Sequence, residues 1–275
     1  MTRTTVKDVL DRYESNEPLT MLTAYDAPMA QMVDEGGVDM ILVGDSAAHN
    51  HMGHEDTLPL TMDEALMNTG SVVRGTKEAM IIADMPFLSY GASMEDSVEN
   101  AGRFIKEAGA DAVKLETAST GGVTVDIVDR LTELGIPVQG HIGLTPQRMK
   151  EIGGPVIQGR GEQSSAPTQE LVDTALELEE AGIFSLVLET VTEQTAREIN
   201  EAVNIPTIGI GAGRYVDGQV LVLNDLIGLK SEDYKLSKQY ADIGAKVRDA
   251  VEQFVSEVRK QEFPTAENAY EPVDE

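Results

Sequence analysis

Cysteine is absent from the 275 residues of this chain. Its absence excludes disulfide bonds, thiolate metal sites and a cysteine nucleophile. No apolar run approaches the roughly 18 residues that a membrane-spanning helix needs. The first seven residues, MTRTTVK, also lack the apolar core of a signal peptide. We therefore expect a cytoplasmic protein that does not enter a membrane.

Basic residues are scarce as well. The chain has 21 Lys and Arg against 48 Asp and Glu, which gives a formal net charge of −27. Nucleic acids and anionic membranes are bound through Lys and Arg, so the composition argues against both as partners. The acids are scattered along the chain. This favours a solvated acidic surface, suited to a very salty cytoplasm, over a site for one cationic partner.

Short apolar runs alternate with amphipathic stretches of helical length along most of the chain. Each run is rich in branched residues, which is typical of a buried parallel strand. The runs lie at residues 21–24, 40–43, 80–83, 112–115, 137–140, 185–188 and 207–210, with a further candidate at 220–223. Helices are expected over residues 26–36, 94–108, 168–181, 192–202 and about 238–260, the last with an apolar stripe from Tyr240 to Val258.

Repeated strand–helix units predict a parallel sheet with right-handed crossovers. Seven or eight units in about 250 residues match a single-domain α/β fold, the (β/α)8 TIM-type barrel. An open doubly wound sheet is the alternative. We favour it less, because it usually has fewer strands and because no glycine-rich dinucleotide-binding turn follows the first run.

Two segments interrupt this alternation. Residues 143–167 form a long glycine-rich connection, a candidate lid over a site. Residues 265–275 are mainly acidic and lack an apolar period, so we expect a disordered tail there. The barrel is then the catalytic domain formed by residues 1–264.

Ionisable residues follow five consecutive apolar runs, the second to the sixth. In a parallel barrel the active site lies at the carboxyl ends of the strands. Charges that converge on one face of a barrel are costly unless a ligand or metal balances them. The pattern therefore predicts an active site at this rim, formed by Asp45, Asp84, Lys114, Glu116, His141 and Glu189.

The residue types at this rim indicate a chemistry. Asp45, Asp84 and Glu116 form an all-oxygen set, which suits Mg²⁺ or Mn²⁺ better than Zn²⁺. Lys114 lies two residues before Glu116, so both side chains can point inward, where Lys114 would bind a substrate carboxylate or stabilise an enolate. Glu189 is a candidate general base for a proton beside a carbonyl, with a structural ion pair as the alternative.

Two further motifs have competing interpretations. His49, His51 and His54 crowd one loop, but their irregular spacing favours surface or polar contacts over a metal site. The run Gly209–Gly213 resembles a phosphate-binding loop. We favour the other reading, in which glycine allows a strand end and a turn to approach closely.

Taken together and in order, the motifs resemble those of the ketopantoate hydroxymethyltransferase family, also called 3-methyl-2-oxobutanoate hydroxymethyltransferase. The resemblance runs collinearly from about residue 17 to residue 264. The motifs are Leu22–Asp26, Leu42–Ser46, Gly53–His54 with Thr57–Thr61, Ala83–Phe87, Val113–Glu116, Gly140–Gln147, Gln158–Arg160, Leu188–Glu189 and Gly209–Gly213 followed by Asp217–Gln219.

The resemblance implies a reaction. A hydroxymethyl group would pass from 5,10-methylenetetrahydrofolate to 3-methyl-2-oxobutanoate through a metal-stabilised enolate, giving 2-dehydropantoate for pantothenate and coenzyme A biosynthesis. Members of this family commonly form ring-shaped oligomers, often decamers, so a homo-oligomer is expected.

It also implies roles for individual residues. The cation would be Mg²⁺, with Mn²⁺ or Co²⁺ as alternatives in the cell. Glu189 would be the proton acceptor, and His141 would line the site against the keto acid. By the same resemblance the metal ligands are Asp45, Asp84 and Glu116, and the keto acid contacts are Asp45, Ser46, Asp84 and Lys114.

One segment departs from the family pattern, and two other functions remain as alternatives. The segment Ala47–Met52 is not the sequence expected after Gly-Asp-Ser, which leaves the folate contacts open. A Mg²⁺-dependent carbon–carbon or carbon–phosphorus lyase of the phosphoenolpyruvate mutase and isocitrate lyase kind is one alternative, although those enzymes commonly use a catalytic cysteine. A non-catalytic binding barrel is the other, and it predicts gaps in the acidic set.

Overall fold

The computed structural model of the chain describes residues 3–118, 122–161, 164, 166–229 and 235–270. Eight parallel strands form a closed barrel in which each strand pairs with the next along the chain, and the eighth pairs with the first. The barrel fold predicted from the alternating pattern is confirmed. The strands are β1 (Leu19–Thr23), β2 (Met40–Val43), β3 (Met80–Asp84), β4 (Ala112–Glu116), β5 (Val138–Gly143), β6 (Ser185–Glu189), β7 (Thr207–Ile210) and β8 (Gly218–Leu221).

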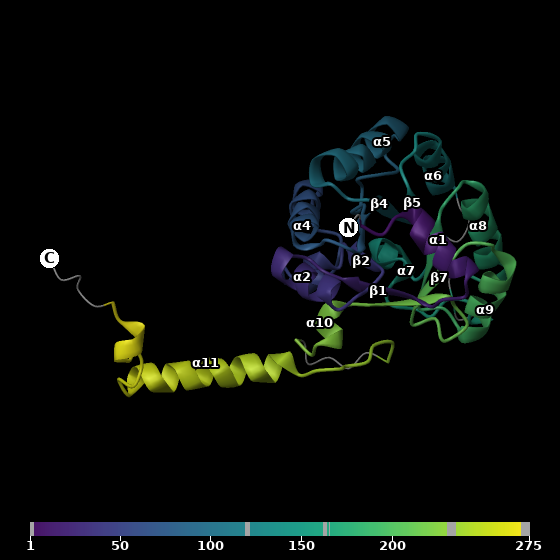
Figure 1. The fold of residues 1–275 in the computed structure, drawn as a ribbon. Coiled ribbons are helices and arrows are strands. Elements are labelled where there is room, and N and C mark those ends of the chain that lie inside the picture. The colour runs from purple at the N-terminus through teal and green to yellow at the C-terminus, as the bar shows by residue number, and fades with distance from the viewer. Residues whose placement is uncertain (1–2, 119–121, 162–163, 165, 230–234, 271–275) are drawn as a thin grey trace.

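Helices α2, α4, α5, α6, α8 and α9 surround the barrel, and α1 lies across one of its ends (Figure 1). Side-chain caps begin several of them: Asp26 caps α2 and Thr61 caps α4, each by accepting a hydrogen bond from a backbone N–H in the first turn. The helical elements are α1 (Val6–Glu14), α2 (Ala27–Glu35), α3 (Ala47–Asn50), α4 (Met62–Gly75), α5 (Met94–Arg103), η1 (Phe104–Ala108), α6 (Val123–Glu133), η2 (Pro146–Arg148), α7 (Met149–Ile152), α8 (Thr168–Glu180), α9 (Glu193–Ala202), α10 (Leu223–Leu226), α11 (Ile243–Arg259) and η4 (Ala266–Asn268).

Some element boundaries differ from the sequence prediction. Strand β8 begins at Gly218, two residues before the predicted run, because Gly218 pairs with Leu19 of β1. A β-carbon at Gly218 would lie 2.6 Å from the backbone oxygen of Leu19, so this pairing requires glycine. The last helix begins at Ile243 rather than near residue 238, because the side chain of Asp242 caps it. Tyr240 therefore precedes the helix.

Two apolar layers form the core. One fills the space between the strands and the surrounding helices, and the other fills the interior of the barrel. Val9 of α1 is fully buried and packs with the interior layer. Apolar side chains thus close the amino-terminal end of the barrel, and the polar interior lies towards the carboxyl ends of the strands.

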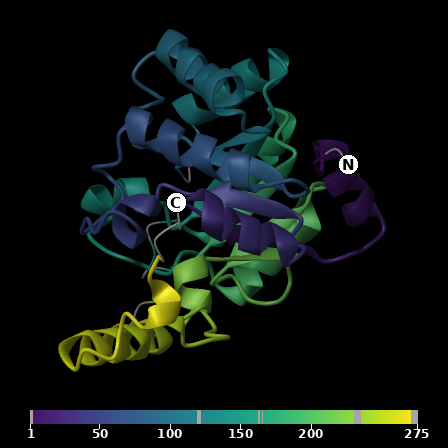
Figure 2. The same ribbon diagram turned by 60° about the vertical axis from the view of Figure 1, so that its left-hand side comes forward.

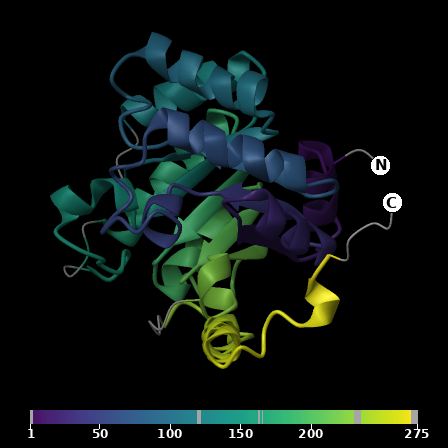
Figure 3. The same cartoon turned by 90° about the vertical axis from the view of Figure 1, so that its left-hand side faces the viewer.

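Helix α11 is different from the helices that surround the barrel. It leaves the barrel beside α10 and extends away from it (Figure 1), and the turned views show it outside the ring of helices (Figure 2, Figure 3). Gly244 is its one buried residue. The side chains of Val247, Val251, Phe254 and Val258 are 44–55% exposed, so the apolar stripe predicted here packs on nothing in the described part of this chain.

The ends of the chain and its longest connection complete the fold. Of the predicted tail, residues 271–275 lie outside the described residues, and a short turn, η4, lies within residues 265–270. In the connection 143–167, Gln158 forms a parallel bridge with Val191, which ties this segment to the end of β6. Its role as a lid stays a prediction. Among the helices described, none has the length and apolar character needed to cross a bilayer.

Candidate active site

A cavity of about 220 Å³ lies at the carboxyl ends of the strands. Side chains from β3, β4, β5 and β6 and from the loop after β2 reach it. All the predicted site residues are brought together here, namely Asp45, Ser46, Asp84, Lys114, Glu116, His141 and Glu189.

The register of the strands explains why these side chains meet. Lys114 and Glu116 are two residues apart on β4, so both point into the barrel. Asp84 at the end of β3 pairs in register with Lys114, and Glu116 pairs in register with His141 of β5. Asp84 therefore lies beside Lys114, and Glu116 lies beside His141, each pair on adjacent strands.

A line of polar groups crosses the floor of the cavity from β3 to β6. Lys114 Nζ lies 2.8 Å from Asp84 Oδ1 as an ion pair and 3.2 Å from His141 Nδ1. Because an ammonium group has only donors, His141 Nδ1 accepts, and the ring proton is on Nε2. That Nε2 atom lies 3.3 Å from Glu189 Oε2. His141 thus lies between the lysine and the candidate base, although its Nε2 atom makes no hydrogen bond to the described residues.

Gln147, on η2 after β5, was not predicted as a site residue. Its side-chain nitrogen donates to Asp45 Oδ2 at 3.0 Å, and its backbone N–H donates to Glu116 Oε2 at 3.0 Å. Tyr90 and Tyr25 were missed as well: the Tyr90 hydroxyl donates to Gln147 Oε1 at 2.9 Å. The Tyr25 hydroxyl lies 3.0 Å from the hydroxyl of Ser46. The one sequence signal for Gln147 is its place in the motif Gly140–Gln147.

Burial dominates the electrostatics of the cavity. Desolvation, followed by the charge of Asp84, raises the pKa of Asp45, and desolvation with the charge of Asp45 raises the pKa of Glu116 well above its ordinary value. Desolvation raises the pKa of Glu189 to about 7. Burial alone would lower the pKa of Lys114, but the surrounding carboxylates outweigh it and raise this pKa.

The same burial keeps His141 neutral. Desolvation and the charge of Lys114 together hold the pKa of His141 well below its ordinary value. A neutral imidazole with its proton on Nε2 can donate towards the Glu189 carboxylate without adding charge to the cavity.

The donor set fits a divalent cation. Asp45, Asp84 and Glu116 are all buried, and Lys114 is the one ammonium group among the residues described around this cavity. Asp84 Oδ1 is engaged by Lys114, whose single positive charge balances only one of the three carboxylates. Hard carboxylate oxygens with excess negative charge are what Mg²⁺ and Mn²⁺ prefer.

The described residues contain no group of three or more His, Asp or Glu side chains already placed as metal ligands. Instead, Lys114 pairs with Asp84, and the Gln147 amide binds Asp45. The case for a divalent cation at this site therefore rests on the oxygen donors and on their net negative charge.

The histidine-rich loop contributes polar contacts, as its irregular spacing predicted. His49 reaches the mouth of the cavity, and its Nδ1 atom lies 2.9 Å from the backbone oxygen of His54. His51 packs near Tyr25, with ring centroids 6.1 Å apart. The rings of His49 and His51 thus have separate partners.

The glycines after β7 allow close approach of neighbouring segments. Gly213 has a positive φ of 81°, and a β-carbon there would lie 2.6 Å from Glu193 Cγ. Gly211 has a φ of 63°, and a β-carbon there would lie 3.1 Å from Leu236 Cβ. Both observations favour the conformational interpretation of this run over phosphate binding.

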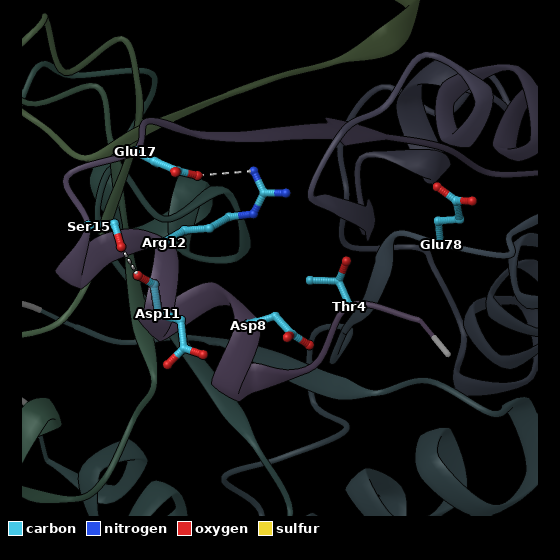
Figure 4. A pocket seen from close by; sticks show the side chains of 7 residues that line it. All are labelled: Thr4, Asp8, Asp11, Arg12, Ser15, Glu17 and Glu78. Carbon is cyan, nitrogen blue, oxygen red and sulfur yellow. Dashed lines mark hydrogen bonds and ion pairs between the residues drawn. The ribbon is translucent and has the colours of Figure 1, made fainter. Parts of the chain in front are cut away.

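A second hollow, of about 500 Å³, lies beside α1 (Figure 4), and none of its described lining residues lines the charged cavity. Its acidic groups are exposed, as is Arg12, which lies 3.8 Å from Glu17. Water screens exposed charges, so the acids of this hollow need no ligand to balance them. Its lining residues are Thr4, Asp8, Asp11, Arg12, Ser15, Glu17 and Glu78.

Comparison with known proteins gives a consistent result. Residues 3–266 match the family model described as ketopantoate hydroxymethyltransferase. A protein of Pseudothermotoga lettingae named 3-methyl-2-oxobutanoate hydroxymethyltransferase is 50% identical over 94% of this chain and 95% of its own length. A protein of Halobacterium salinarum with the same name is 49% identical over 94% and 92%.

Solved structures with low sequence identity share the fold. A 2,3-dimethylmalate lyase of the PEP mutase/isocitrate lyase superfamily has a TM-score of 0.61 at 12% identity, covering 99% of this chain and 93% of that one. A phosphonopyruvate hydrolase in complex with oxalate and Mg²⁺ has a TM-score of 0.61 at 15% identity, covering 98% and 92%. These similarities show the barrel fold.

Proposed function

Because the chain belongs to the ketopantoate hydroxymethyltransferase family and is a hydroxymethyltransferase of 3-methyl-2-oxobutanoate, we propose that its one-carbon donor is 5,10-methylenetetrahydrofolate and its product 2-dehydropantoate. The observation that carries the proposal is the presence of a partly buried carboxylate, Glu189, and a buried ammonium group, Lys114, in the lining of one small cavity. The first can remove a proton, and the second can stabilise the negative charge that removal creates.

The cavity has a polar side and an apolar side that match the two ends of the keto acid. On the polar side Lys114 donates to the keto acid oxygens, with Ser46, Asp45 and Asp84 around them. On the other side Val187, Ile210 and Val220 line the cavity. We propose that the branched hydrocarbon end of the substrate lies against these apolar side chains, which turns its C3–H towards Glu189.

Glu189 takes the C3 proton on a side-chain oxygen. The electron pair left behind spreads towards the keto oxygen, where the Lys114 ammonium group donates a hydrogen bond. His141 Nε2 lies 3.3 Å from Glu189 Oε2, where its N–H would help to orient the carboxylate. C3 then forms a bond to the methylene carbon of 5,10-methylenetetrahydrofolate, whose two carbon–nitrogen bonds break in turn. A water molecule supplies the hydroxyl group of the product, and tetrahydrofolate leaves with the proton taken by Glu189 and one proton from that water on its two nitrogens. Because C3 is hindered, orientation of the two substrates by the cavity must supply much of the rate.

We propose that Asp45, Asp84 and Glu116 hold a divalent cation, Mg²⁺ or alternatively Mn²⁺ or Co²⁺. Three buried carboxylates beside one ammonium group support this. When bound, the cation would withdraw electron density from the keto acid and make its C3 proton more acidic.

We further propose that the chain forms a homo-oligomer in the cytoplasm, with a decamer as the expected size. The exposed apolar stripe of α11 supports an assembly in which a second copy covers Val251 and Phe254. Light scattering after size-exclusion chromatography tests it. Val251→Asp should reduce the size of the particle, whereas Val123→Asp, at an apolar residue equally exposed on α6, should not. A monomeric unmutated protein would contradict the assembly.

One assay tests the activity. The purified protein is incubated with 3-methyl-2-oxobutanoate, Mg²⁺ and 5,10-methylenetetrahydrofolate, and the product is identified by its mass. We expect 2-dehydropantoate, formed only when all components are present. Formation of product without the folate would show that another one-carbon donor is used and would contradict the proposed donor. Cleavage of 2,3-dimethylmalate or phosphonopyruvate in its place would contradict the proposal and favour the lyase alternative.

A further inference from the structure

Gln147 binds two carboxylates that come from different strands. Its side-chain Nε2 donates to Asp45 Oδ2, just after β2, and its backbone N–H donates to Glu116 Oε2, at the end of β4. Gln147 is itself buried. Each contact engages one oxygen of a carboxylate, so the other oxygen of each group can still face the cavity.

The orientation of the Gln147 amide is determined by its neighbours. Nε2 has two acceptors, Asp45 Oδ2 and the backbone oxygen of Met85, the latter at 2.9 Å. Oε1 accepts from the Tyr90 hydroxyl, which in turn accepts from the backbone N–H of Glu116 at 3.2 Å. A flipped amide would place Oε1 against two acceptors, so only one orientation satisfies these partners.

We propose that Gln147 is the positioning residue that holds Asp45 and Glu116 in place for a divalent cation. Two buried carboxylates repel each other and turn apart unless donors fix them. A neutral amide fixes them and leaves their charge intact, whereas a lysine at this position would neutralise the charge that attracts the cation. This inference rests on the proposed cation site and gives a role to Gln147, which the motif Gly140–Gln147 contains without assigning it one.

The test measures Mn²⁺ affinity directly, by calorimetry or by the electron paramagnetic resonance signal of free Mn²⁺, without any turnover. Gln147→Met keeps the length of the side chain and removes its donors and acceptor. Loss of a group that orients metal ligands commonly weakens metal binding about 10- to 100-fold, and we expect a loss of this size.

Two further variants sharpen the result. Tyr90→Phe removes the hydroxyl that orients the amide, and we expect a smaller loss in the same direction. Gln139→Met is the matched control, because Gln139 is also a buried glutamine on the β5 side of the barrel and its side chain donates to Ser185 instead. We expect Mn²⁺ affinity within about threefold of the unmutated protein for this control.

Several outcomes would overturn the inference. Unchanged Mn²⁺ affinity in a folded Gln147→Met protein would do so, and so would an equal loss in Gln139→Met, which would indicate a general packing effect. If Gln147→Met does not fold, as judged by circular dichroism and thermal melting, unchanged affinity in Tyr90→Phe decides against it.

The cation and the activity can fail separately. An unmutated protein that binds no Mn²⁺ overturns both the cation site and this inference. An unmutated protein that binds Mn²⁺ but forms no 2-dehydropantoate overturns the proposed reaction alone and leaves the role of Gln147 standing.

Discussion

Buried carboxylates lie at both ends of the barrel, but their partners differ. At the amino-terminal end, Asp34 accepts hydrogen bonds from three successive backbone N–H groups of residues 77–79, at 2.8, 3.1 and 2.8 Å, just before β3. Asp217, a partly buried carboxylate just before β8, accepts from the backbone N–H and the hydroxyl of Thr207, at 2.8 and 2.9 Å. Asp34 thus ties α2 to the segment before β3, and Asp217 ties the start of β8 to β7.

At the carboxyl-terminal end the carboxylates face one another across a cavity. Asp45 and Glu116 each have a single hydrogen-bond contact from Gln147, and burial raises the pKa of both. A carboxylate bound by backbone donors stabilises the fold, whereas one left facing other carboxylates is available to a ligand. The comparison therefore predicts that activity and stability can be lost separately, each at its own end of the barrel.

The largest expected effect is at the carboxyl-terminal end. Glu189→Gln removes the base but keeps nearly the same shape. We expect the exchange of the C3 proton of 3-methyl-2-oxobutanoate in D₂O, followed by NMR with Mg²⁺ present, to slow by about 10²- to 10⁴-fold. Binding of the keto acid should be retained, since the amide that replaces the carboxylate need not contact the cation. Exchange at the unmutated rate would show that another group removes the proton.

The matching change at the amino-terminal end should affect folding instead. Asp34→Ala removes the acceptors of three backbone N–H groups near the start of β3. Leaving buried donors unpaired costs about 1–3 kcal/mol, which is a change of roughly 5- to 150-fold in the unfolding equilibrium. Urea denaturation measures it, with Asp34→Asn, which keeps one acceptor oxygen, as the control.

Turnover of the folded Asp34→Ala protein at room temperature should equal that of the unmutated protein. Lost turnover without lost stability would contradict the separation of the two ends.

A smaller effect, about tenfold, is expected from pH. The base must be deprotonated to act, and burial raises the pKa of Glu189 to about 7. The exchange rate should therefore rise from about pH 6 to about pH 8, being about one tenth of its plateau at the lower pH. The exchange reaction is quenched at set times at each pH, and NMR of the remaining C3 proton gives the exchange rate as a function of pH. A rate that is flat or falls over this interval would show that Glu189 is not the titrating base.

The sequence was informative wherever local pattern determines placement. Parallel strands buried on both faces need continuous apolar runs, and the barrel brings the residue after each run to one rim, so Asp84, Glu116 and Glu189 could be predicted together. Gln147 could not be predicted in this way. It lies four residues beyond the end of β5, and no spacing rule shows that its amide turns back to Asp45, 102 residues earlier in the chain.

Helix α11 illustrates another limit. The stripe from Val247 to Val258 correctly predicted an amphipathic helix, but an apolar face shows only that something must cover it. The segment between β8 and the helix decides, by its length and direction, whether the barrel of the same chain covers that apolar face. These are properties of the fold, which the periodicity of one helix does not contain.

The smallest expected effect lies in the exposed acids beside α1 (Figure 4). Asp11 pairs with Lys7 in the same helix, and both side chains are more than half exposed. Exposed pairs of this kind contribute little to stability, so Asp11→Asn should shift the melting temperature by less than about 2 °C.

The substitution also lowers the magnitude of the net charge from 27 to 26. Self-repulsion of the acidic surface is screened by salt, so both proteins should melt at higher temperature in molar KCl than in dilute buffer. Melts of both proteins in both buffers complete the measurement. A large drop in melting temperature from Asp11→Asn would show that an exposed acid stabilises this fold as much as a buried one. Equal melting temperatures in dilute buffer and in molar KCl would contradict self-repulsion of the acidic surface.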